Sequence, residues 1–362
     1  MNELICRLAL QFQPHFGIIT IKKLIQQFGT ATAIFEAHPS RTPLGKKMAL
    51  PKLTATSLRA AENEANWMSK NNISLCFYTD PDYPKRLKNC VDAPYLFYYK
   101  GKNIFNHEKV VSIVGTRNIS SYGKDITKKI VEELTPYNTC IVSGLACGVD
   151  SIAHEQALEN DLPTVAVLGC GLKTIYPYIN DRLAQHIIDK GGALLTEFPF
   201  QTKPDRQNFP QRNRIIAGLA DATIVMETAK RGGSIITAYL AHSYNRDVFA
   251  TPGSVFTPQH EGCHELIRKN LAALITSGHD IAEMMGWSQQ KPKTIQRNLF
   301  VELSDDEQLV CDTIKTSPNI TIDDLTLAFP QYSPSKLAAL LLQLELKGMI
   351  LCNPGKQYRL YD

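Results

Sequence analysis

The chain lacks the long hydrophobic runs and the paired cysteines that mark membrane proteins and disulfide-bonded secreted proteins. No apolar stretch reaches roughly 18 residues, and no positively charged start is followed by an apolar run. Nine cysteines are an odd number, and none of them forms a C-x-x-C pair. We therefore expect a soluble, cytoplasmic protein without membrane association, whose thiols are reduced and mostly buried, with no disulfide framework and no structural zinc site.

Nucleotide-binding fingerprints are missing as well. The nearest approach to a dinucleotide-binding loop, GCGLKT at 169–174, lacks the third glycine. The loop at 115–124 is not a Walker A loop, because its Gly-Lys comes eight residues after the first glycine instead of five. We therefore expect no cofactor.

One short stretch, HEGCH at 260–264, matches the zinc signature H-E-x-x-H. Pro258 lies just ahead and Gly262 lies in its middle, so a helix carrying both histidines would begin almost at His260. Ligand spacing is least secure at a helix end. We interpret the match as accidental and expect no metal.

The net charge of +4 is distributed unevenly. Residues 1–107 carry 14 Lys/Arg against 7 Asp/Glu, a net +7, whereas residues 298–362 carry 5 against 9, a net −4. Residues 108–297 are close to neutral, at +1. The basic first part can lie near a polyanion, although basic surfaces also serve solubility alone, and the acidic last part is a poor candidate for such a contact.

Apolar periodicity predicts a helical domain over residues 1–70. Apolar residues recur at helical spacing there, as in IKKLIQQFGTATAIF, and Gly29 separates one helix from the next. A small domain of the SAM or helix-hairpin-helix kind and a helical cap with no binding role both fit this pattern.

Residues 71–287 begin with a connecting segment and then alternate short β-branched runs with helix-length segments. The runs lie at 110–115, 140–144, 164–169 and 222–227, and several end in a small residue. This alternation predicts an α/β fold with an extended Rossmann-like, doubly wound sheet, covered on both faces and binding its ligand at the carboxyl edge.

A linker at 288–300 leads to a domain at 301–362, in which three expected helices are followed by a hairpin. This order predicts a winged-helix-like domain. The third helix is mostly Ala and Leu, with Lys336 at its start and Lys347 at its end. A helix that reads DNA is normally basic, so we favour a protein-contact role for this domain.

The first strand-end loop carries Arg117, Ser120 and Ser121 at the opening of a helix. Backbone N–H groups at a helix start together with a guanidinium suit a phosphate group. A surface salt bridge is the alternative role for Arg117.

The second strand-end loop, SGLACGVDSIAH at 143–154, again places small residues before a helix. Glycines such as Gly144 let a backbone approach a bulky ligand closely. We expect Asp150 to be a helix N-cap, His154 to be a packed helix residue, and Cys147 and Cys170 to be small packing residues.

The stretch DRQNFPQRNRIIAGL at 205–219 indicates a single-strand site. Arg206, Arg212 and Arg214 bracket Phe209 just before an apolar helix, and Asn213 lies between two of the arginines. Bases of a single-stranded nucleic acid stack on an aromatic face while guanidinium groups hold the phosphates.

A second anion site is expected at ETAKRGGSIITA, 227–238. There Lys230 and Arg231 precede a helix start at Gly232 and Gly233. Recognition of duplex DNA would instead require a basic reading helix, and the sequence offers none.

At these loops the sequence resembles the DNA-processing protein A family, DprA or Smf. The matching stretches are VSIVGTRNISSYG, IVSGLACGVDSIAH, the IYP turn, FPQRNRIIAGL, the Gly-Gly-Ser helix start and DVFATPGSV, in that order over about 180 residues. The family pattern G-x-N-x-L-I also fits at Gly262, Leu266 and Ile267, with His264 in place of the asparagine.

The resemblance implies a protein that binds and protects single-stranded DNA taken up in natural transformation and helps to load the RecA recombinase, with no chemical reaction of its own. It also implies a homodimer formed through the Rossmann-like domain. By motif match, the DNA pocket would comprise Arg117, the backbone around Gly144, Arg206, Phe209, Arg212, Asn213 and the Lys230–Gly233 turn.

An enzyme on a similar sheet is the alternative. Nucleoside-monophosphate phosphoribohydrolases carry the pattern P-G-G-x-G-T-x-x-E, whose helix glutamate performs the chemistry. Here the related turn reads RGGSIITAYL, and the glutamate position falls on Tyr239 or Leu240. A phosphate pocket without that carboxylate is a binding site, so we favour a protein that is not an enzyme.

Overall fold

The computed structural model describes residues 2–37, 50–288, 303–317, 320–347, 349–353 and 356–360. The chain forms two compact units, Met1–Gln290 and Lys291–Asp362. Almost all of the predicted linker at 288–300 lies outside the described residues. None of the described helices is both long enough and apolar enough to cross a membrane.

A nine-stranded sheet forms the centre of the first unit, with the order β1-β2-β6-β5-β4-β3-β7-β8-β9. The strands from β3 onward pair in parallel, whereas β2 is antiparallel to both β1 and β6. The chain runs outward from β3 in one direction to β6 and then in the other from β7 to β9, so the crossover direction reverses between β3 and β7. Ligands bind at such a reversal in open α/β sheets. The strands are β1 (Ser74–Phe77), β2 (Leu96–Gly101), β3 (Val110–Val114), β4 (Cys140–Ser143), β5 (Thr164–Val167), β6 (Ala193–Thr196), β7 (Ala222–Val225), β8 (Asp247–Ala250) and β9 (Ala273–Leu274).

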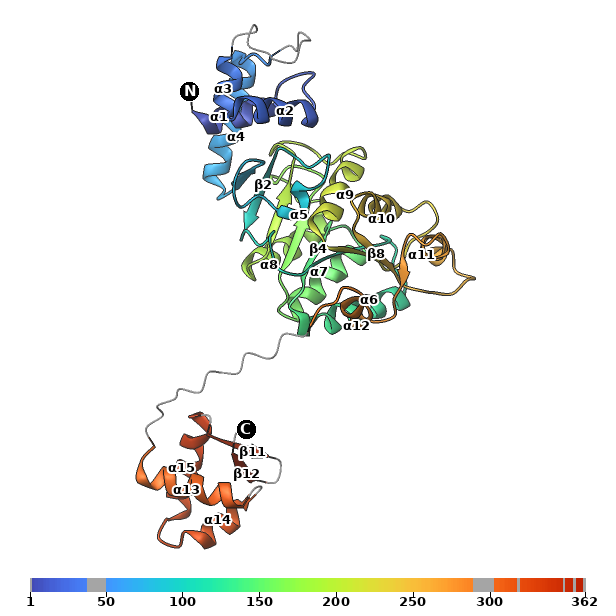
Figure 1. The fold of residues 1–362 in the computed structure, drawn as a ribbon. Helices are drawn as coiled ribbons and strands as arrows, with labels where there is room; N and C mark the ends of the chain where they lie inside the picture. Colours follow the sequence, from blue (N-terminus) through green and yellow to red (C-terminus); the bar gives the residue numbers. More distant parts are fainter. Residues whose placement is uncertain are drawn as a thin grey trace. The chain divides into compact units, whose positions relative to one another are not determined.

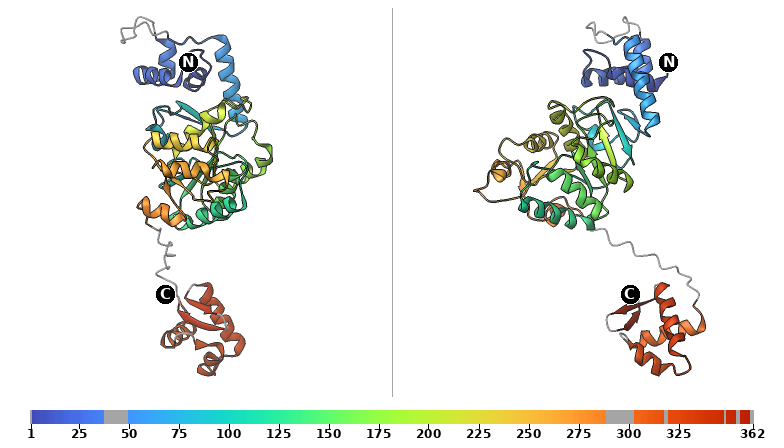
Figure 2. Two further views of the ribbon diagram at one scale, coloured as in Figure 1. Left: turned by 90° about the vertical axis from the view of Figure 1, so that its right-hand side faces the viewer. Right: turned by 180° about the vertical axis from the view of Figure 1, so that it is seen from behind.

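Helices cover both faces of this sheet, which confirms the predicted α/β class. Val111 and Ile113 of β3 pack with α6, α7 and α12, while the alternate residues Val110 and Val114 pack with α9 and α10. Figures 1 and 2 show the same division, with the yellow to orange helices α9 to α11 on one side. The helices are α5 (Lys85–Lys88), α6 (Ser121–Glu133), α7 (Val149–Glu159), α8 (Asp181–Asp189), α9 (Asn208–Leu219), α10 (Gly233–Ser243), α11 (Glu261–Arg268) and α12 (Gly278–Met284).

Among the described N-terminal residues, four helices precede the sheet: α1 (Glu3–Gln11), α2 (Ile18–Phe28), α3 (Ala31–Glu36) and α4 (Ala55–Lys70). Gly29 ends α2 at a φ of 81°, as its predicted helix-breaking role requires. These helices share one hydrophobic core with residues of β1 and β2. The buried carboxyl of Glu64 accepts the Phe200 backbone N–H at 2.8 Å, and Trp67 stacks on the Phe200 ring at 4.8 Å. The helical segment is thus packed onto the sheet rather than tethered to it.

The C-terminal unit contains the three predicted helices and the predicted hairpin. A short strand, β10, was not predicted, and it completes an antiparallel sheet in the order β10-β12-β11. The winged-helix-like assignment stays an interpretation of this element order. The elements are α13 (Asp305–Thr316), β10 (Ile320–Thr321), α14 (Ile322–Ala328), α15 (Pro334–Leu346), β11 (Ile350–Asn353) and β12 (Gln357–Leu360).

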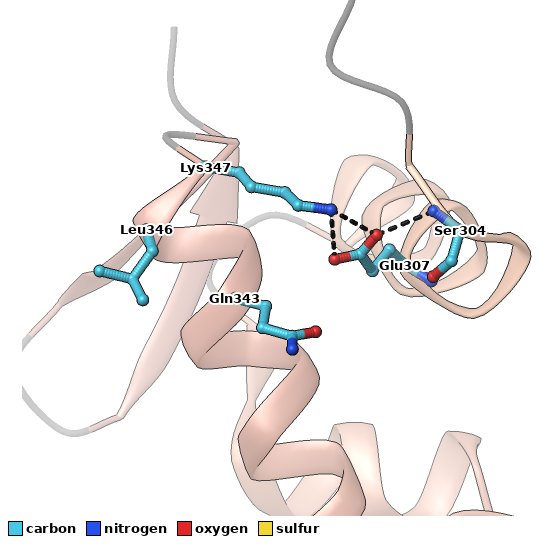
Figure 3. A pocket seen from close by; sticks show the side chains of 5 residues that line it. All are labelled: Ser304, Glu307, Gln343, Leu346 and Lys347. Atoms are coloured by element: carbon cyan, nitrogen blue, oxygen red, sulfur yellow. Dashed lines mark hydrogen bonds and ion pairs between the residues drawn. The ribbon is translucent and has the colours of Figure 1, made fainter.

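A shallow hollow on this unit lies between the start of α13 and the end of α15 (Figure 3). The buried carboxylate of Glu307 accepts the Ser304 backbone N–H at 2.8 Å and meets Lys347 Nζ at 2.7 Å. These bonds pair the buried Glu307 charge inside the unit. We therefore interpret the hollow as the place where an ion pair joins α13 to the end of α15, and not as a charged ligand site.

Candidate nucleic-acid interface

A cavity of about 590 Å³ opens at the carboxyl edge of the sheet, where the crossover direction reverses. Its wall brings together the loop after β3, the loop after β4, the first turns of α9 and the start of α10. Predicted site residues that line it are Arg117, Arg206, Phe209, Arg212, Asn213, Gly232 and Gly233. Gly144 lines a smaller adjoining cavity that shares Arg117, Phe209 and Arg212. Ser120, Lys230 and Arg231 are absent from both walls.

Phe209 and Arg117 form the stacking platform of this cavity. The exposed Arg117 guanidinium lies over the Phe209 ring, with 5.4 Å between its central carbon and the ring centroid. Phe209 is half-buried in the first turn of α9, not ahead of the helix as predicted. Its ring packs against Gly169, where a Cβ atom would lie 2.8 Å from the ring. The ring thus packs on Gly169 and lines the cavity together with the Arg117 guanidinium.

Tyr176 belongs to this platform, although the sequence analysis did not assign it to the site. Its ring centroid lies 5.8 Å from that of Phe209, at an interplanar angle of 36°, and it lines both cavities. The only sequence signal was its position in the IYP turn, far from Phe209 along the chain. The pair offers two aromatic surfaces to a ligand with flat rings.

Arg212 links α9 to the ends of β4 and β5 beneath the cavity surface. It is buried, and its Nη1 donates to the carbonyl oxygens of Gly144 at 2.6 Å and Val167 at 2.5 Å. A Cβ atom at Gly144 would lie only 1.9 Å from that nitrogen, so a larger residue there would displace the Arg212 guanidinium. Burial lowers the pKa of Arg212, and the carboxylate of Asp150 opposes this shift.

Arg214, two residues further on, does not bracket Phe209, which corrects the sequence interpretation. Its guanidinium is buried, donates to the carbonyl oxygen of Asp92 at 2.5 Å and pairs with Glu197. Residues two apart on a helix point to different sides, so only one of these arginines can face the cavity.

Asp150 is not the helix N-cap that the sequence predicts. The cap is Gly148, at a φ of 84°, and Asp150 lies within the first turn of α7. Its carboxylate accepts the backbone N–H groups of Gly144 at 3.1 Å and Ala146 at 3.4 Å, and it lines the cavity. Burial raises its pKa, whereas Arg212 lowers it. Asp150 thus stabilises the loop between β4 and α7 through these hydrogen bonds.

His154 is a packed helix residue, as predicted. It is buried and its Nδ1 lies 2.7 Å from the Thr164 hydroxyl. Burial lowers its pKa to about 3, so the imidazole is neutral at pH 7. Seven of the nine cysteines are likewise buried as predicted, including Cys170, while Cys147 is half-buried beside the smaller cavity.

The start of α10 is open to the cavity. Gly232 is its N-cap and makes no side-chain cap hydrogen bond, and a Cβ atom at Gly233 would meet nothing within 4 Å. Unpaired N–H groups at a helix start bind anions. Asn213 reaches this turn from α9 through a 3.5 Å hydrogen bond to the Gly233 carbonyl oxygen. Lys230 and Arg231 are exposed on the preceding turn.

The start of α6 differs, because the protein supplies its own acceptors there. The Ser120 hydroxyl caps the helix by accepting the Gly123 N–H at 3.0 Å. The Ser120 N–H donates to the buried carboxylate of Glu227 at 2.9 Å. Of the two helix starts proposed from the sequence, α10 is the one without a side-chain cap, and its Gly232 N–H donates to the Ala229 carbonyl oxygen at 2.9 Å.

The HEGCH stretch begins a helix at Glu261, with His260 as its N-cap residue. The buried His260 has its Nε2 3.6 Å from Glu227 Oε1, whereas His264 Nε2 contacts the Gly253 carbonyl oxygen at 3.0 Å. The two imidazoles therefore have separate partners.

Within the described ranges, one cluster of potential metal ligands occurs, at Cys76, Asp80 and Asp82. Arg7 pairs with the carboxylate of Asp80, and burial raises the pKa of Cys76 to about 12. A protonated thiol beside a paired carboxylate is a poor metal ligand set.

Comparison with known proteins decides the family. The sequence model of DNA recombination-mediator protein A matches residues 74–286. Protein Smf of Escherichia coli is 34% identical over 307 residues, which is 83% of this chain and 81% of that protein. The chain belongs to the DNA recombination-mediator protein A family.

Relatives and solved structures within the family match more than half of the chain. DNA processing protein DprA of Streptococcus pneumoniae is 43% identical over 202 residues, covering 56% of this chain and 71% of that protein. The X-ray structure of the Streptococcus pneumoniae protein has a TM-score of 0.65 at 30% identity, covering 80% of this chain and all of that one. DNA processing protein A from Helicobacter pylori, described for its single-stranded DNA binding mode, has a TM-score of 0.55 at 29% identity, covering 61% and 99%.

Proposed function

We propose that the cavity at the carboxyl edge binds single-stranded DNA and that the protein works as a recombination mediator rather than as an enzyme. The observation that carries this proposal is the platform of Phe209 and Tyr176 with the Arg117 guanidinium over the Phe209 ring. Bases stack on such rings in any sequence, while cations hold the phosphates. The single-stranded DNA binding mode described for the Helicobacter pylori protein supports it.

The residues at the cavity have different parts in this proposal. Arg117 and Arg206 are exposed and supply positive charge at the cavity, and the start of α10 at Gly233, which lacks a side-chain cap, receives a phosphate. Lys230 and Arg231 attract the strand from the rim without lining the wall. Arg212, Gly144 and Asp150 hold the loop after β4 in position.

The wider role follows from the family. We propose that the protein protects incoming single-stranded DNA in natural transformation, in the cytoplasm, and promotes loading of the RecA recombinase as a homodimer. Light scattering of the purified chain tests the dimer. An assay of RecA filament growth on DNA covered by single-strand-binding protein tests loading, and an absence of stimulation would contradict it.

The phosphoribohydrolase alternative has no carboxylate in the required place. Tyr239 is exposed on α10 where the catalytic glutamate would lie. Asp150 is the carboxylate that lines the cavity, and it is bound to two backbone N–H groups. Release of free base from a nucleoside monophosphate would support hydrolysis and contradict the binding proposal.

Fluorescence anisotropy with labelled single-stranded and duplex oligonucleotides tests the binding site. We expect tight, salt-sensitive binding that prefers single strands and falls about tenfold at low salt in Arg117→Ala/Arg206→Ala, because each lost phosphate contact costs roughly threefold. The matched control is Arg182→Ala/Arg268→Ala, which removes the same charge from exposed positions outside the cavity. Equal binding of single strands and duplex, or equal losses in both variants, would contradict this site.

A further inference from the structure

A second cavity, of about 630 Å³, lies between helix α2 and the segment around α5 and shares no residue with the cavity at the carboxyl edge. We call it the lysine groove and define it by Lys22, Lys23, Gln26, Tyr78, Lys88 and Val91. We propose that the lysine groove binds phosphate groups of the same DNA strand that occupies the first cavity. The inference rests on the proposed function and extends the strand's path onto the N-terminal helices.

Two ammonium groups gather around one aromatic ring in the groove. Lys22 Nζ lies 4.6 Å and Lys88 Nζ 5.2 Å from the centroid of the Tyr78 ring. The Tyr78 ring also makes an edge-type contact with the Tyr83 ring, with 5.3 Å between the two centroids. The ring face attracts each cation, but the two cations repel one another. An anion bound in the groove near both ammonium groups would be attracted by each of them.

No carboxylate within the described ranges forms an ion pair with Lys22, Lys23 or Lys88. Lys22 is half-buried, and its Nζ donates only a long hydrogen bond, 3.4 Å, to the Val91 carbonyl oxygen. Asp92 is the nearby acid, and its carboxylate accepts the Tyr244 hydroxyl at 2.6 Å. Burial lowers the pKa of Lys22, with Asp92 raising it and Arg214 lowering it. A partly desolvated ammonium with so weak a partner gains most from an external anion.

The remaining surface of the groove suits a nucleotide chain better than a simple ion. Ile19 and Val91 are 55% and 76% exposed at its rim and offer apolar contact to sugars and bases. Gln26, Thr79 and Asn89 are exposed polar side chains beside them. Residues 1–107, which contain the whole groove, carry a net +7. A single-stranded nucleic acid alternates phosphate groups with partly apolar sugars and bases, so it matches this combination of lysines and apolar rim residues.

Helix α9 links the groove to the first cavity. Its face with Phe209, Asn213 and Ile216 lines the first cavity, whereas the opposite face carries Arg214 and Gly218. A Cβ atom at Gly218 would lie 2.7 Å from Leu87 of α5, the helix that ends in Lys88.

The face of α9 that carries Arg214 is hydrogen-bonded to the backbone beside the lysine groove. Arg214 donates to the carbonyl oxygen of Asp92, the residue after Val91. Both sites are therefore fixed on one helix within one compact unit, so a strand can be held by both without a conformational change.

The test uses the full chain and single-stranded oligonucleotides of two lengths, about 6 and about 30 nucleotides, within and beyond the reach of one site. We expect Lys22→Gln/Lys88→Gln to weaken binding of the longer strand about tenfold at low salt and to reduce the slope of log affinity against log salt by about 1.4. Binding of the shorter strand is expected to stay at the wild-type value. The control, Lys70→Gln/Lys128→Gln, changes the net charge equally at exposed positions outside the groove.

Losses that are equal for both lengths, or equal in the groove and control variants, would overturn the proposal, because the lysines would then act through the overall field. A loss confined to duplex DNA of the same length would overturn it too. Failure of the proposed function is distinguishable, since the wild type would then show no single-strand preference even with the shorter strand. Acetylation footprinting of the wild type needs no variant: the longer strand should protect Lys22 and Lys88 and the shorter should not, and equal labelling would again refute the groove.

Discussion

Arg212 is buried and is expected to support the site without touching the ligand, unlike the exposed Arg117 and Arg206. Replacing Arg212 by methionine tests this distinction. The guanidinium donates two hydrogen bonds to buried carbonyl oxygens, of Gly144 and Val167, and lies in the field of Asp150. Methionine fills a similar volume without any donor. The variant therefore leaves two carbonyl groups unpaired and one buried carboxyl without its counter-charge.

The cost follows from these losses. Each buried carbonyl left without a partner costs about 1–3 kcal/mol. Protonation of Asp150 limits the electrostatic part, because burial already raises its pKa. We expect Arg212→Met to destabilise the first unit by roughly 2–5 kcal/mol, a large share of the ~5–15 kcal/mol that stabilises a typical domain. The melting temperature should fall by roughly 5–15 °C.

Tryptophan fluorescence during thermal unfolding measures this effect selectively. Trp67 and Trp287 are the two tryptophans of the chain, and both lie in the first unit, so the C-terminal unit does not contribute to the signal. The matched control is Arg117→Met, at an exposed position, which should change stability by less than about 0.5 kcal/mol while weakening single-strand binding.

The opposite pattern would refute the reasoning. If Arg212→Met melts like the wild type but loses DNA binding as Arg117→Met does, then Arg212 contacts the ligand directly. Its Nε, which has no hydrogen-bond partner among the described residues, would be the atom responsible.

Three further predictions follow from the same structure. Phe209→Ala should weaken single-strand binding by about 1–3 kcal/mol, roughly 5- to 150-fold, and similarly for oligo(dT) and oligo(dA) in an anisotropy titration, whereas a loss restricted to one base would contradict stacking. Gly169→Ala should weaken the same binding with little change in melting temperature, because the new Cβ displaces the Phe209 ring; unchanged affinity would mean that the ring position is unimportant. Burial raises the pKa of Glu64 to about 7, so its contribution to stability is present below pH 4.5 and is lost as the pH rises through about 7. Glu64→Gln keeps an acceptor for the Phe200 N–H and should stabilise the protein by roughly 1–3 kcal/mol at pH 8 but not at pH 4.5 in urea titrations, and parallel pH profiles of the two proteins would contradict this.

Local pattern was sufficient for the four central strands of the parallel sheet. The β-branched runs at 110–115, 140–144, 164–169 and 222–227 became β3, β4, β5 and β7, because buried parallel strands are apolar on both faces and stand out in a sequence. The antiparallel strands β1 and β2, the parallel strands β6 and β8 and the short edge strand β9 were not predicted from pattern. Their residues are mixed in polarity, and their pairing depends on partners distant in the chain.

The same limit applies within the site. Sequence alone pointed to Phe209, Arg117, Arg206 and Arg212, all of which line the cavity, because the chemistry of aromatic and guanidinium groups can be read from residue type. It did not separate Arg212 and Arg214, which are buried, from Arg117 and Arg206, which are exposed, nor did it bring Tyr176 to Phe209. The side of α9 that each arginine faces, and the acceptors that occupy the start of α6, depend on how the helices pack against the sheet. Burial and hydrogen-bond partners come from segments far apart in the chain, and only the folded structure brings those segments together.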